Sequence, residues 1–529
     1  MALRLPPRYV LASILCSFGG FLFGMDTGII GPVTVMKEFT SQFGTHSPTI
    51  HGLIVSAILI PAALSSFFAG KVADVLGRPI AISIGAFVFG LGAALECGAV
   101  QISMFVVGRI VEGLGEGLYL GTLVVYICEI SPPSQRGPLT SAPQLFITFG
   151  VMTGFFTCYG SNNVESSFAW RAPFLILACL SFVFSAVSFV WLVASPRWLT
   201  LHGRHEEALA MWEHLGVDLA DREKVEDNPT PLVTPFQSTE SLVKHKHSFA
   251  DVFKKDVRKR TFLAVFLMGM QQLSGIDGVL YYAPLLFQQA GLASSQASFL
   301  ASGVSAILIF TSTIPGLIFS DRWGRRTSII FGGLGLTICM FIIGSLYASS
   351  SVHSHAGAGR WVVIVCIYIF AVIFSISWAV AVKVYAAEIQ PQRTRASATS
   401  LAHGSNWITN FLVALTTPIL LAKSSYAAYF LWGDARCARL SFVRFGCRRR
   451  GGGIWGRLSR RSMRRRSRGL LVGFRKVLLE LNHVHDWLKI DASNYECVSH
   501  VRNDATETVE YEEKMPLLLW KWIVRGRHQ

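Results

Sequence analysis

Eleven apolar stretches, each long enough to cross a lipid bilayer, constrain this chain more than any other feature of its sequence. They cover residues 9–31, 50–69, 79–98, 101–126, 139–160, 171–194, 261–287, 297–319, 327–348, 360–387 and 396–421. A helix of about 20 apolar residues matches the hydrocarbon thickness of a membrane. Only 15% of the residues are charged, against about 25% in soluble domains. The sequence therefore predicts an all-α membrane protein that crosses the bilayer many times.

The apolar stretches fall into two groups, which predicts two transmembrane bundles. Six lie within residues 1–194 and five within 261–433, and a twelfth begins at Tyr426 but stops near Gly433. The polar segment 195–260 between the groups is expected to be a loop with short helices, at Arg204 to Leu215 and Ser248 to Val257. We expect it to act as a surface lid rather than as a separate folded domain.

Basic residues in the short loops predict the orientation of the bundles, because cytoplasmic loops are enriched in Lys and Arg. The loops on one side of the membrane contain Arg4, Arg8, Lys71, Arg78, Arg136, Arg322, Arg325, Arg326, Arg393 and Arg395. The N-terminus and the 195–260 loop are therefore expected in the cytoplasm. The plasma membrane is the expected location.

Residues 434–529 do not continue the pattern of spans. This tail carries 21 Lys and Arg against 10 Asp and Glu, and hence most of the formal net charge of +16. Runs such as Arg448–Arg450 cannot lie in hydrocarbon. Because the change falls inside an expected helix, we interpret the tail as a shifted reading frame, a retained intron or a mistaken gene model. A basic tail that binds anionic lipid and a signalling tail are the alternatives.

Two charged motifs occur once in each half of the chain, which indicates an internal repeat. Asp-x-x-Gly-Arg follows the second and eighth spans, and Glu-x-x-Pro-x-x-x-Arg follows the fourth and tenth, 247 and 259 residues apart. We expect their charges to form a cytoplasmic latch whose salt bridges between the halves stabilise the outward-open state and break on the inward transition; the alternative is that they only orient the helices. The latch residues are Asp74, Arg78, Glu129, Arg136, Asp321, Arg325, Glu388 and Arg395.

Further motifs give the chain a family resemblance. The first span contains GGFLFGMDTG from Gly19 to Gly28, the seventh contains QQLSGI from Gln271 followed by a Tyr pair, and SPRWL follows the sixth from Ser195. With the loop motifs, these segments resemble the sugar porters of the major facilitator superfamily, most closely the fungal monosaccharide:proton symporters. The resemblance implies a major facilitator fold of two six-helix bundles, with the twelfth helix here truncated or replaced. It also implies a monomer that works by alternating access.

Several positions differ from the family pattern and leave the identity of the sugar open. Pro79 replaces a basic residue, and Val193-Ala194 replaces Pro-Glu. Asp277 stands where most sugar porters have Asn, Ala379-Val380 replaces Gly-Pro, and Lys383 replaces an aromatic residue. Glu112 and Glu116 occupy positions that are usually small or apolar.

Asp26 is an acid inside an apolar span, where a charge is costly unless it is paired or hydrated. Arg109 in the fourth span is its expected partner. The resemblance implies that the pair couples transport to protons, since a carboxylate left by its Arg would take up a proton. A static pair that fixes helix packing is the alternative. Glu112 and Glu116 lie three and seven residues after Arg109, on the same helix face, and either pair with basic groups or form a second proton site.

A sugar site needs amides for the hydroxyl groups and aromatic rings for the apolar face. By the family motifs, the expected substrate-binding residues are Gln144, Gln271, Gln272, Asp277, Trp378, Asn406 and Trp407. Buried amides that only bridge helices are the alternative. Tyr281 and Tyr282 are expected to form an extracellular gate, or else to anchor the helix at the membrane interface.

The sequence contains no catalytic, metal or cofactor motif, and its ten cysteines lack zinc or redox spacing. We therefore expect a transporter rather than an enzyme, with a monosaccharide, protons and the lipid bilayer as partners and no nucleic acid. The predicted function is proton-coupled symport of a hexose or pentose. The alternatives are transport of a polyol or a sugar acid such as quinate or galacturonate, and a sugar sensor that does not transport.

Overall fold

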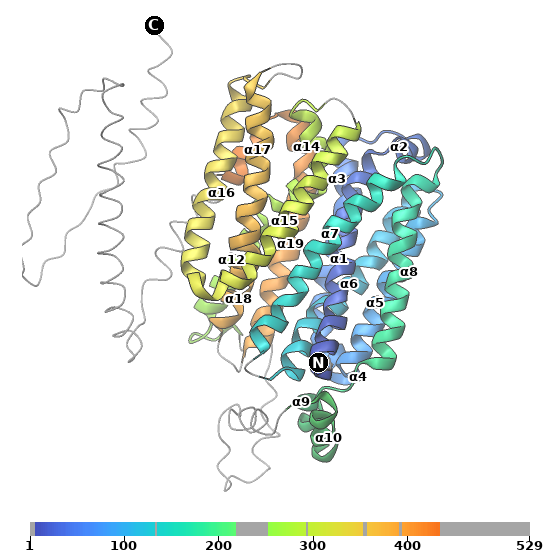
Figure 1. Ribbon diagram of the computed structural model, residues 1–529, viewed down its shortest axis with the longest axis vertical. Coiled ribbons are helices and arrows are strands. Elements are labelled where there is room, and N and C mark those ends of the chain that lie inside the picture. Colours follow the sequence, from blue (N-terminus) through green and yellow to red (C-terminus); the bar gives the residue numbers. More distant parts are fainter. Residues whose placement is uncertain are drawn as a thin grey trace, which may run out of the picture. The chain divides into compact units, whose positions relative to one another are not determined.

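The described chain is almost entirely α-helical, as the apolar stretches predict (Figure 1). The computed structural model describes residues 6–132, 135–217, 252–292, 295–352, 357–390 and 394–433. All of them belong to one structural unit, Met1–Arg448. Within these residues, eleven helical segments are long and apolar enough to span a membrane. The predicted number of complete spans is thus confirmed.

The first bundle contains six spans. They are α1 (Arg8–Val35), α3 (Pro48–Ser56) continued by α4 (Leu59–Leu76), α5 (Arg78–Cys97), α6 (Ile102–Ile130), α7 (Arg136–Ser161) and α8 (Phe168–Trp191). A short helix that the sequence did not predict, α2 (Lys37–Phe43), follows the first span.

Small residues let these helices approach each other closely, as is common in membranes. On α1, a Cβ built at Gly24 would lie 1.9 Å from the carbonyl oxygen of Ile147 on α7. On α5, a Cβ at Gly92 would lie 2.4 Å from the backbone nitrogen of Glu112 on α6. Backbone therefore packs against backbone between α1 and α7 and between α5 and α6.

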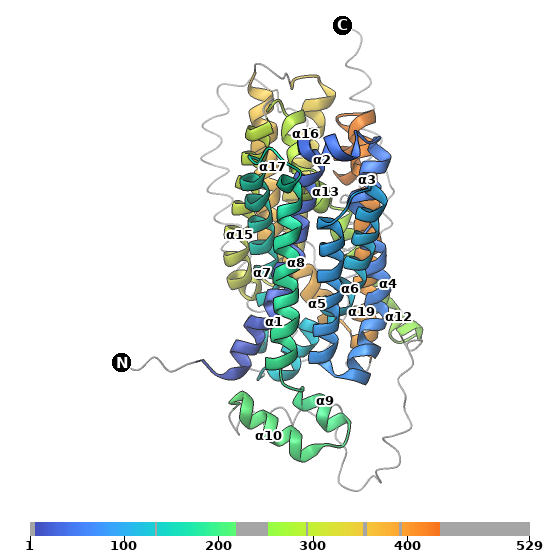
Figure 2. The same ribbon diagram turned by 90° about the vertical axis from the view of Figure 1, so that its right-hand side faces the viewer.

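Two short helices, α9 (Pro196–Leu201) and α10 (His205–Leu215), follow the sixth span and lie at one end of the bundle, called here the α10 end (Figure 2). The predicted helix at Arg204 to Leu215 is confirmed by α10. The predicted helix at Ser248 to Val257 is wrong where it is described, because residues 252–257 form a short 3-10 segment and turns.

The second bundle begins with a broken span. Its elements are α12 (Arg258–Gln272), α13 (Ile276–Tyr281), α14 (Ala283–Gln289), α15 (Ser295–Trp323), α16 (Arg325–Ala348), α17 (Ala358–Ile373), the π-helical turn η2 (Phe374–Trp378), α18 (Ala379–Glu388) and α19 (Arg395–Lys423). The break between α12 and α13 falls at Gly275, whose φ of 80° lies in the left-handed region that favours glycine.

The tenth span is distorted without a proline. The family resemblance leads us to expect Gly-Pro after Trp378, whereas this chain has Ala379-Val380 there, and its helix widens into η2 just before them. Two glycines on neighbouring helices make room for the wider turn: a Cβ at Gly332 would lie 2.1 Å from Ser377 Oγ, and one at Gly316 2.9 Å from the Ser375 carbonyl oxygen. Such π-turns often occur at functional sites.

The start of the expected twelfth helix is present, since residues 427–433 are helical. Tyr429 stacks on Tyr347 with ring centroids 5.6 Å apart. Trp432 packs over Gly275, where a Cβ would lie 2.4 Å from the indole. The segment therefore helps to hold the break in the seventh span. The predicted tail, 434–529, lies outside the described residues.

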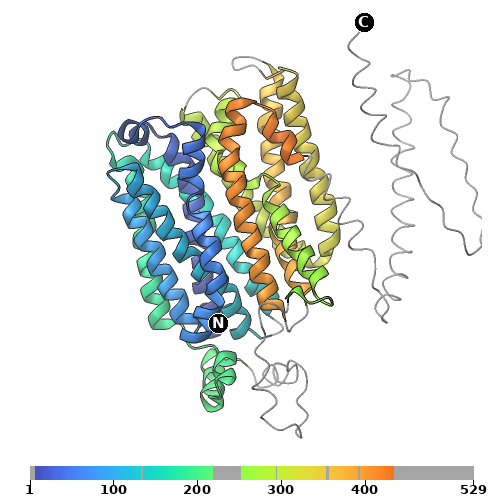
Figure 3. The ribbon, with the colours of Figure 1, turned by 180° about the vertical axis from the view of Figure 1, so that it is seen from behind.

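The two bundles contact each other at several levels (Figure 3). At the end opposite α10, called here the far end, a Cβ at Gly31 would lie 2.0 Å from the carbonyl oxygen of Tyr281. Midway, the ring of Phe23 meets Trp407 edge to face at 5.7 Å. Toward the α10 end, the Phe67 ring covers Gly404.

Candidate transport site

An ion pair between α1 and α6 lies at the centre of the first bundle. Arg109 Nη1 donates to Asp26 Oδ1 at 2.5 Å, and Nη2 donates to the carbonyl oxygen of Val55 on α3 at 3.4 Å. Asp26 is 2% exposed and Arg109 is fully buried. The expected partners are thus in direct contact, and their role in proton coupling remains a prediction.

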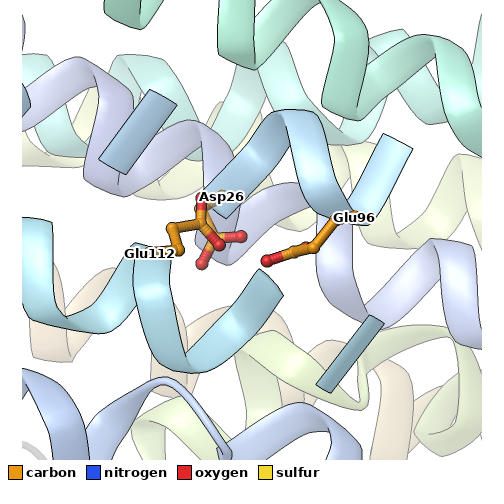
Figure 4. A group of neighbouring side chains, drawn as sticks. All are labelled: Asp26, Glu96 and Glu112. Atoms are coloured by element: carbon orange, nitrogen blue, oxygen red, sulfur yellow. The ribbon is translucent and has the colours of Figure 1, made fainter. Parts of the chain in front are cut away.

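Two more acids reach the same guanidinium. Glu112 Oε2 lies 3.1 Å and Glu96 Oε2 lies 3.7 Å from Arg109 Nη1. Figure 4 shows the carboxyl groups of Asp26, Glu96 and Glu112 converging, and one oxygen from each lies within 4.8 Å of the others. The cation among these oxygens is the guanidinium itself, so the arrangement is a shared ion pair.

Glu96 is not among the site residues predicted from the sequence. It lies two residues before the predicted end of the third span, where an acid is easily taken as part of the polar boundary. The feature of the sequence that could have identified it is a pair of glycines, Gly92 on α5 and Gly108 on α6, which let the two helices pack closely. A Cβ at Gly108 would lie 2.6 Å from Glu96 Cγ. This close packing carries Glu96 inward, where it is fully buried.

Glu116 is the fourth buried acid of this cluster. It is fully buried, and among the described residues neither of its carboxyl oxygens has a hydrogen-bond partner. Three carboxyl groups therefore lie within 4.0 Å of one guanidinium, and the Glu116 carboxyl group is buried within electrostatic range of it. Uncompensated buried charge is very costly in a medium of low dielectric, and one guanidinium offers these acids a single positive charge. We call Asp26, Glu96, Glu112 and Glu116 the acid cluster.

The predicted amides of the second bundle form one network between α12 and α19. Gln272 Nε2 donates to Asn406 Oδ1 at 3.2 Å, and Asn406 Nδ2 donates to Gln271 Oε1 at 3.3 Å. Gln271 Nε2 donates to the carbonyl oxygen of Trp378 at 2.8 Å. In the described chain Gln272 Oε1 has no partner. The network thus offers an acceptor that a solute hydroxyl group can satisfy.

The two predicted tryptophans lie in different surroundings. Trp378 is buried within the second bundle, and its indole N–H donates to the carbonyl oxygen of Ile329 at 3.0 Å. Trp407 lies between the bundles against Phe23. In this conformation Trp407 is therefore better placed than Trp378 to meet a solute, and stacking by either ring remains a prediction.

A lysine joins the two bundles at the same level. Lys383 Nζ on α18 donates to Gln144 Oε1 on α7 at 2.9 Å. Asp277 on α13 and His403 on α19 are within electrostatic range of its ammonium group. Gln144 and Asp277 are predicted substrate residues, and the structure brings both of them to Lys383.

The predicted gate residues, Tyr281 and Tyr282, lie at the contact between the bundles at the far end, and their gating role remains a prediction. The Tyr282 hydroxyl donates to the carbonyl oxygen of Ala414 at 2.8 Å, and its ring meets His51 of the first bundle edge to face at 5.5 Å. Tyr281 lies against Gly31, and its hydroxyl is 3.5 Å from Asn410 Nδ2. Both Tyr side chains are buried.

Of the predicted latch residues, the structure describes the side chains of the first-bundle set only. Arg78 contacts Asp74 at 2.9 Å and Glu129 at 3.0 Å, and Arg136 donates to the carbonyl oxygen of Ser131 at 3.2 Å. The side chains of the second set, Asp321, Arg325, Glu388 and Arg395, lie outside the described residues.

Two helical bundles of membrane-spanning helices, with a buried acid cluster in one and an amide network in the other, define a multi-pass integral membrane protein with the architecture of a solute transporter. The family model described as sugar (and other) transporter matches residues 12–447. The chain belongs to this family, the sugar porters of the major facilitator superfamily, which are transporters and not enzymes.

Similar proteins are known from yeast and plants. The low-affinity glucose transporter HXT1 of Saccharomyces cerevisiae is 31% identical over 453 residues, covering 80% of this chain and 77% of the relative. The sugar transport protein MST7 of Oryza sativa subsp. japonica is 27% identical, covering 82% and 87%.

Solved structures confirm the predicted fold. The xylose transporter XylE from E. coli, in a partially occluded inward-open conformation, matches with a TM-score of 0.68 at 23% identity, covering 84% of this chain and 99% of that chain. A crystal structure of a D-xylose-proton symporter matches with a TM-score of 0.63 at 24% identity, covering 82% and 97%.

Proposed function

We propose that this protein imports a monosaccharide together with protons, by alternating access. The observation that carries the proposal is the direct contact between Asp26 and Arg109 inside the acid cluster. Relatives described as glucose and hexose transporters and a structural neighbour described as a D-xylose-proton symporter support a sugar as the solute.

The proton step begins at Asp26. While Arg109 donates to it, the carboxylate is neutralised by the guanidinium. Protonation of Asp26 removes this attraction, and the guanidinium then turns to Glu96 and Glu112, which already lie within 4 Å of the same nitrogen. Arg109 therefore moves between acids without ever being left unpaired in the membrane, which would be costly.

The sugar step uses groups from both bundles. Gln271, Gln272 and Asn406 supply amide donors and acceptors from the second bundle, while Gln144 supplies an amide from the first. Trp407 presents an indole between the bundles. Because the solute bridges the bundles, its binding favours the closed arrangement from which either end can open.

The ends of the protein open in turn. The far end is held by the contacts of Tyr281 and Tyr282 with the first bundle, so we assign this conformation to the part of the cycle that faces the α10 end. Opening of the far end separates these contacts, and the charged latch at the α10 end then holds that end closed. We place the α10 end and the N-terminus in the cytoplasm and the protein in the plasma membrane, acting as a monomer.

The test is uptake of labelled hexoses and pentoses by transporter-deficient yeast that express the full chain. We expect accumulation above the external concentration at acidic external pH and its loss when a protonophore is added. Uptake that only reaches equilibrium would contradict proton coupling. Surface expression with no flux of any sugar, together with a sugar-dependent transcriptional response, would instead indicate a sensor.

A further inference from the structure

We propose that Lys383 recognises a carboxylate on the sugar, so that the preferred solute is a sugar acid rather than a neutral sugar. This inference rests on the proposed function and names the chemical class of its substrate. The observation behind it is the half-buried Lys383 ammonium between the bundles, bonded to Gln144.

Lys383 has hydrogen-bonding capacity to spare. An ammonium group has three N–H donors and no acceptor, and in the part of the chain that the structure describes only Gln144 Oε1 takes one of them. No carboxylate in the described chain lies within 4.0 Å of Nζ. Two donors are therefore available to a solute.

The charges around Lys383 leave room for an anion. Asp277 on α13 and His403 on α19 face it within electrostatic range, but Asp277 makes no direct ion pair with it. A hydroxyl group can accept from Lys383, yet only a carboxylate supplies the opposite charge, and charge-assisted hydrogen bonds are roughly twice as strong as neutral ones.

The position of Lys383 also fits a contact with solute. It lies five residues after η2, on α18, and reaches across to the first bundle. Its Gln144 partner is one of the amides expected to bind sugar. A solute that displaces this contact must offer Lys383 an equally good acceptor, which a carboxylate does and an apolar ring face does not.

The acid cluster suits such a solute as well. The negative interior of a cell opposes the entry of a sugar anion. One proton carried with each anion cancels its charge and removes this opposition. Glu96, Glu112 and Glu116 give the first bundle more proton-binding groups than the Asp26–Arg109 pair alone. The structure therefore provides proton capacity together with a cation for the solute.

The experiment compares matched neutral and acidic sugars in transporter-deficient yeast. Uptake of labelled galacturonate and galactose, and of gluconate and glucose, is measured for the wild type and for Lys383→Met, Lys383→Arg and Lys423→Met. Lys423, an exposed lysine at the end of α19, is the matched control. Surface abundance is quantified for every variant.

We expect the wild type to prefer the acids, and Lys383→Met to lower acid uptake about tenfold or more relative to its effect on neutral uptake. Lys383→Arg should retain part of the acid uptake, and Lys423→Met should match the wild type. A wild type that takes up neutral sugars and is not inhibited by excess sugar acid would overturn the inference and leave the proposed function intact. A wild type that reaches the surface and moves neither class would overturn both.

Discussion

Arg109 Nη1 donates to Asp26 at 2.5 Å and lies 3.1 Å from Glu112, so one nitrogen is shared by acids from two helices. An arrangement of this kind ties the position of the guanidinium to the protonation of each acid. It also makes the first bundle sensitive to any change in the balance of charge.

Neutralising Asp26 should separate flux from accumulation. In Asp26→Asn the amide cannot bind or release a proton, so we expect uphill uptake to be lost while exchange of labelled for unlabelled sugar continues. The measurement is accumulation at acidic external pH beside counterflow in vesicles. Glu207→Gln, an exposed acid on α10, is the control, and unchanged accumulation in Asp26→Asn would refute the coupling role.

Removing the cation of the acid cluster should destabilise the fold. Arg109→Met leaves three buried carboxyl groups without their partner, and breaking a buried ion pair costs about 3–5 kcal/mol. We expect a clearly lower thermal unfolding temperature in detergent, and partial recovery in the double variant Arg109→Met with Glu112→Gln. If both variants unfold at the wild-type temperature, the cluster is not held by the guanidinium.

Removing an unpaired acid should have the opposite effect. Neither oxygen of Glu116 has a hydrogen-bond partner in the described chain, so Glu116→Gln removes an ionisable group without breaking a contact. We expect an unfolding temperature equal to or above that of the wild type, and a pH dependence of uptake that differs from it. Arg109→Met should lower the unfolding temperature and Glu116→Gln should not, so a loss in both variants would contradict this reasoning.

The break in the seventh span depends on Gly275. Its φ of 80° and the indole of Trp432 against its Cα both exclude a side chain, so Gly275→Ala should cost about 1–3 kcal/mol. Thermal unfolding measures this loss. Gly121→Ala is the matched control, because a Cβ there meets nothing within 4 Å and alanine favours the helix; a similar loss in both variants would contradict the argument.

Closure of the far end can be tested by cross-linking. His51 and Tyr282 lie on different bundles with ring centroids 5.5 Å apart. In a background without reactive native thiols, His51→Cys with Tyr282→Cys should be joined by a short, reducible bifunctional thiol reagent, which should stop uptake, and a reductant should restore it. Each single variant should be unaffected, and a double variant that transports normally while cross-linked would exclude opening at this end.

The sequence predicts the fold well because lipid leaves few choices. Apolar length sets the spans, but the break at Gly275 was not predicted, because the apolar stretch 261–287 runs through it without interruption. The contact of Asp26 with Arg109 is predictable too, since each is the natural partner of the other in an apolar setting.

What the sequence does not give is the position of groups that depend on packing between helices. Glu96 reaches Arg109 only because Gly92 and Gly108 bring α5 and α6 together. Trp378 points into the second bundle because η2 turns its indole toward Ile329. The contact of Lys383 with Gln144 needs the relative placement of two bundles, which no local pattern encodes.

The wide turn at η2 has a mechanical consequence. The π-helical turn η2 holds one residue more than a turn of regular α-helix. A change from one to the other shifts the hydrogen-bond register by one residue, and each residue of an α-helix advances by about 100°. Tightening η2 would therefore swing α18 around its axis and carry Lys383 off Gln144. A distortion made by proline cannot be removed by such a shift, because proline lacks the N–H group, whereas η2 has no proline to prevent it.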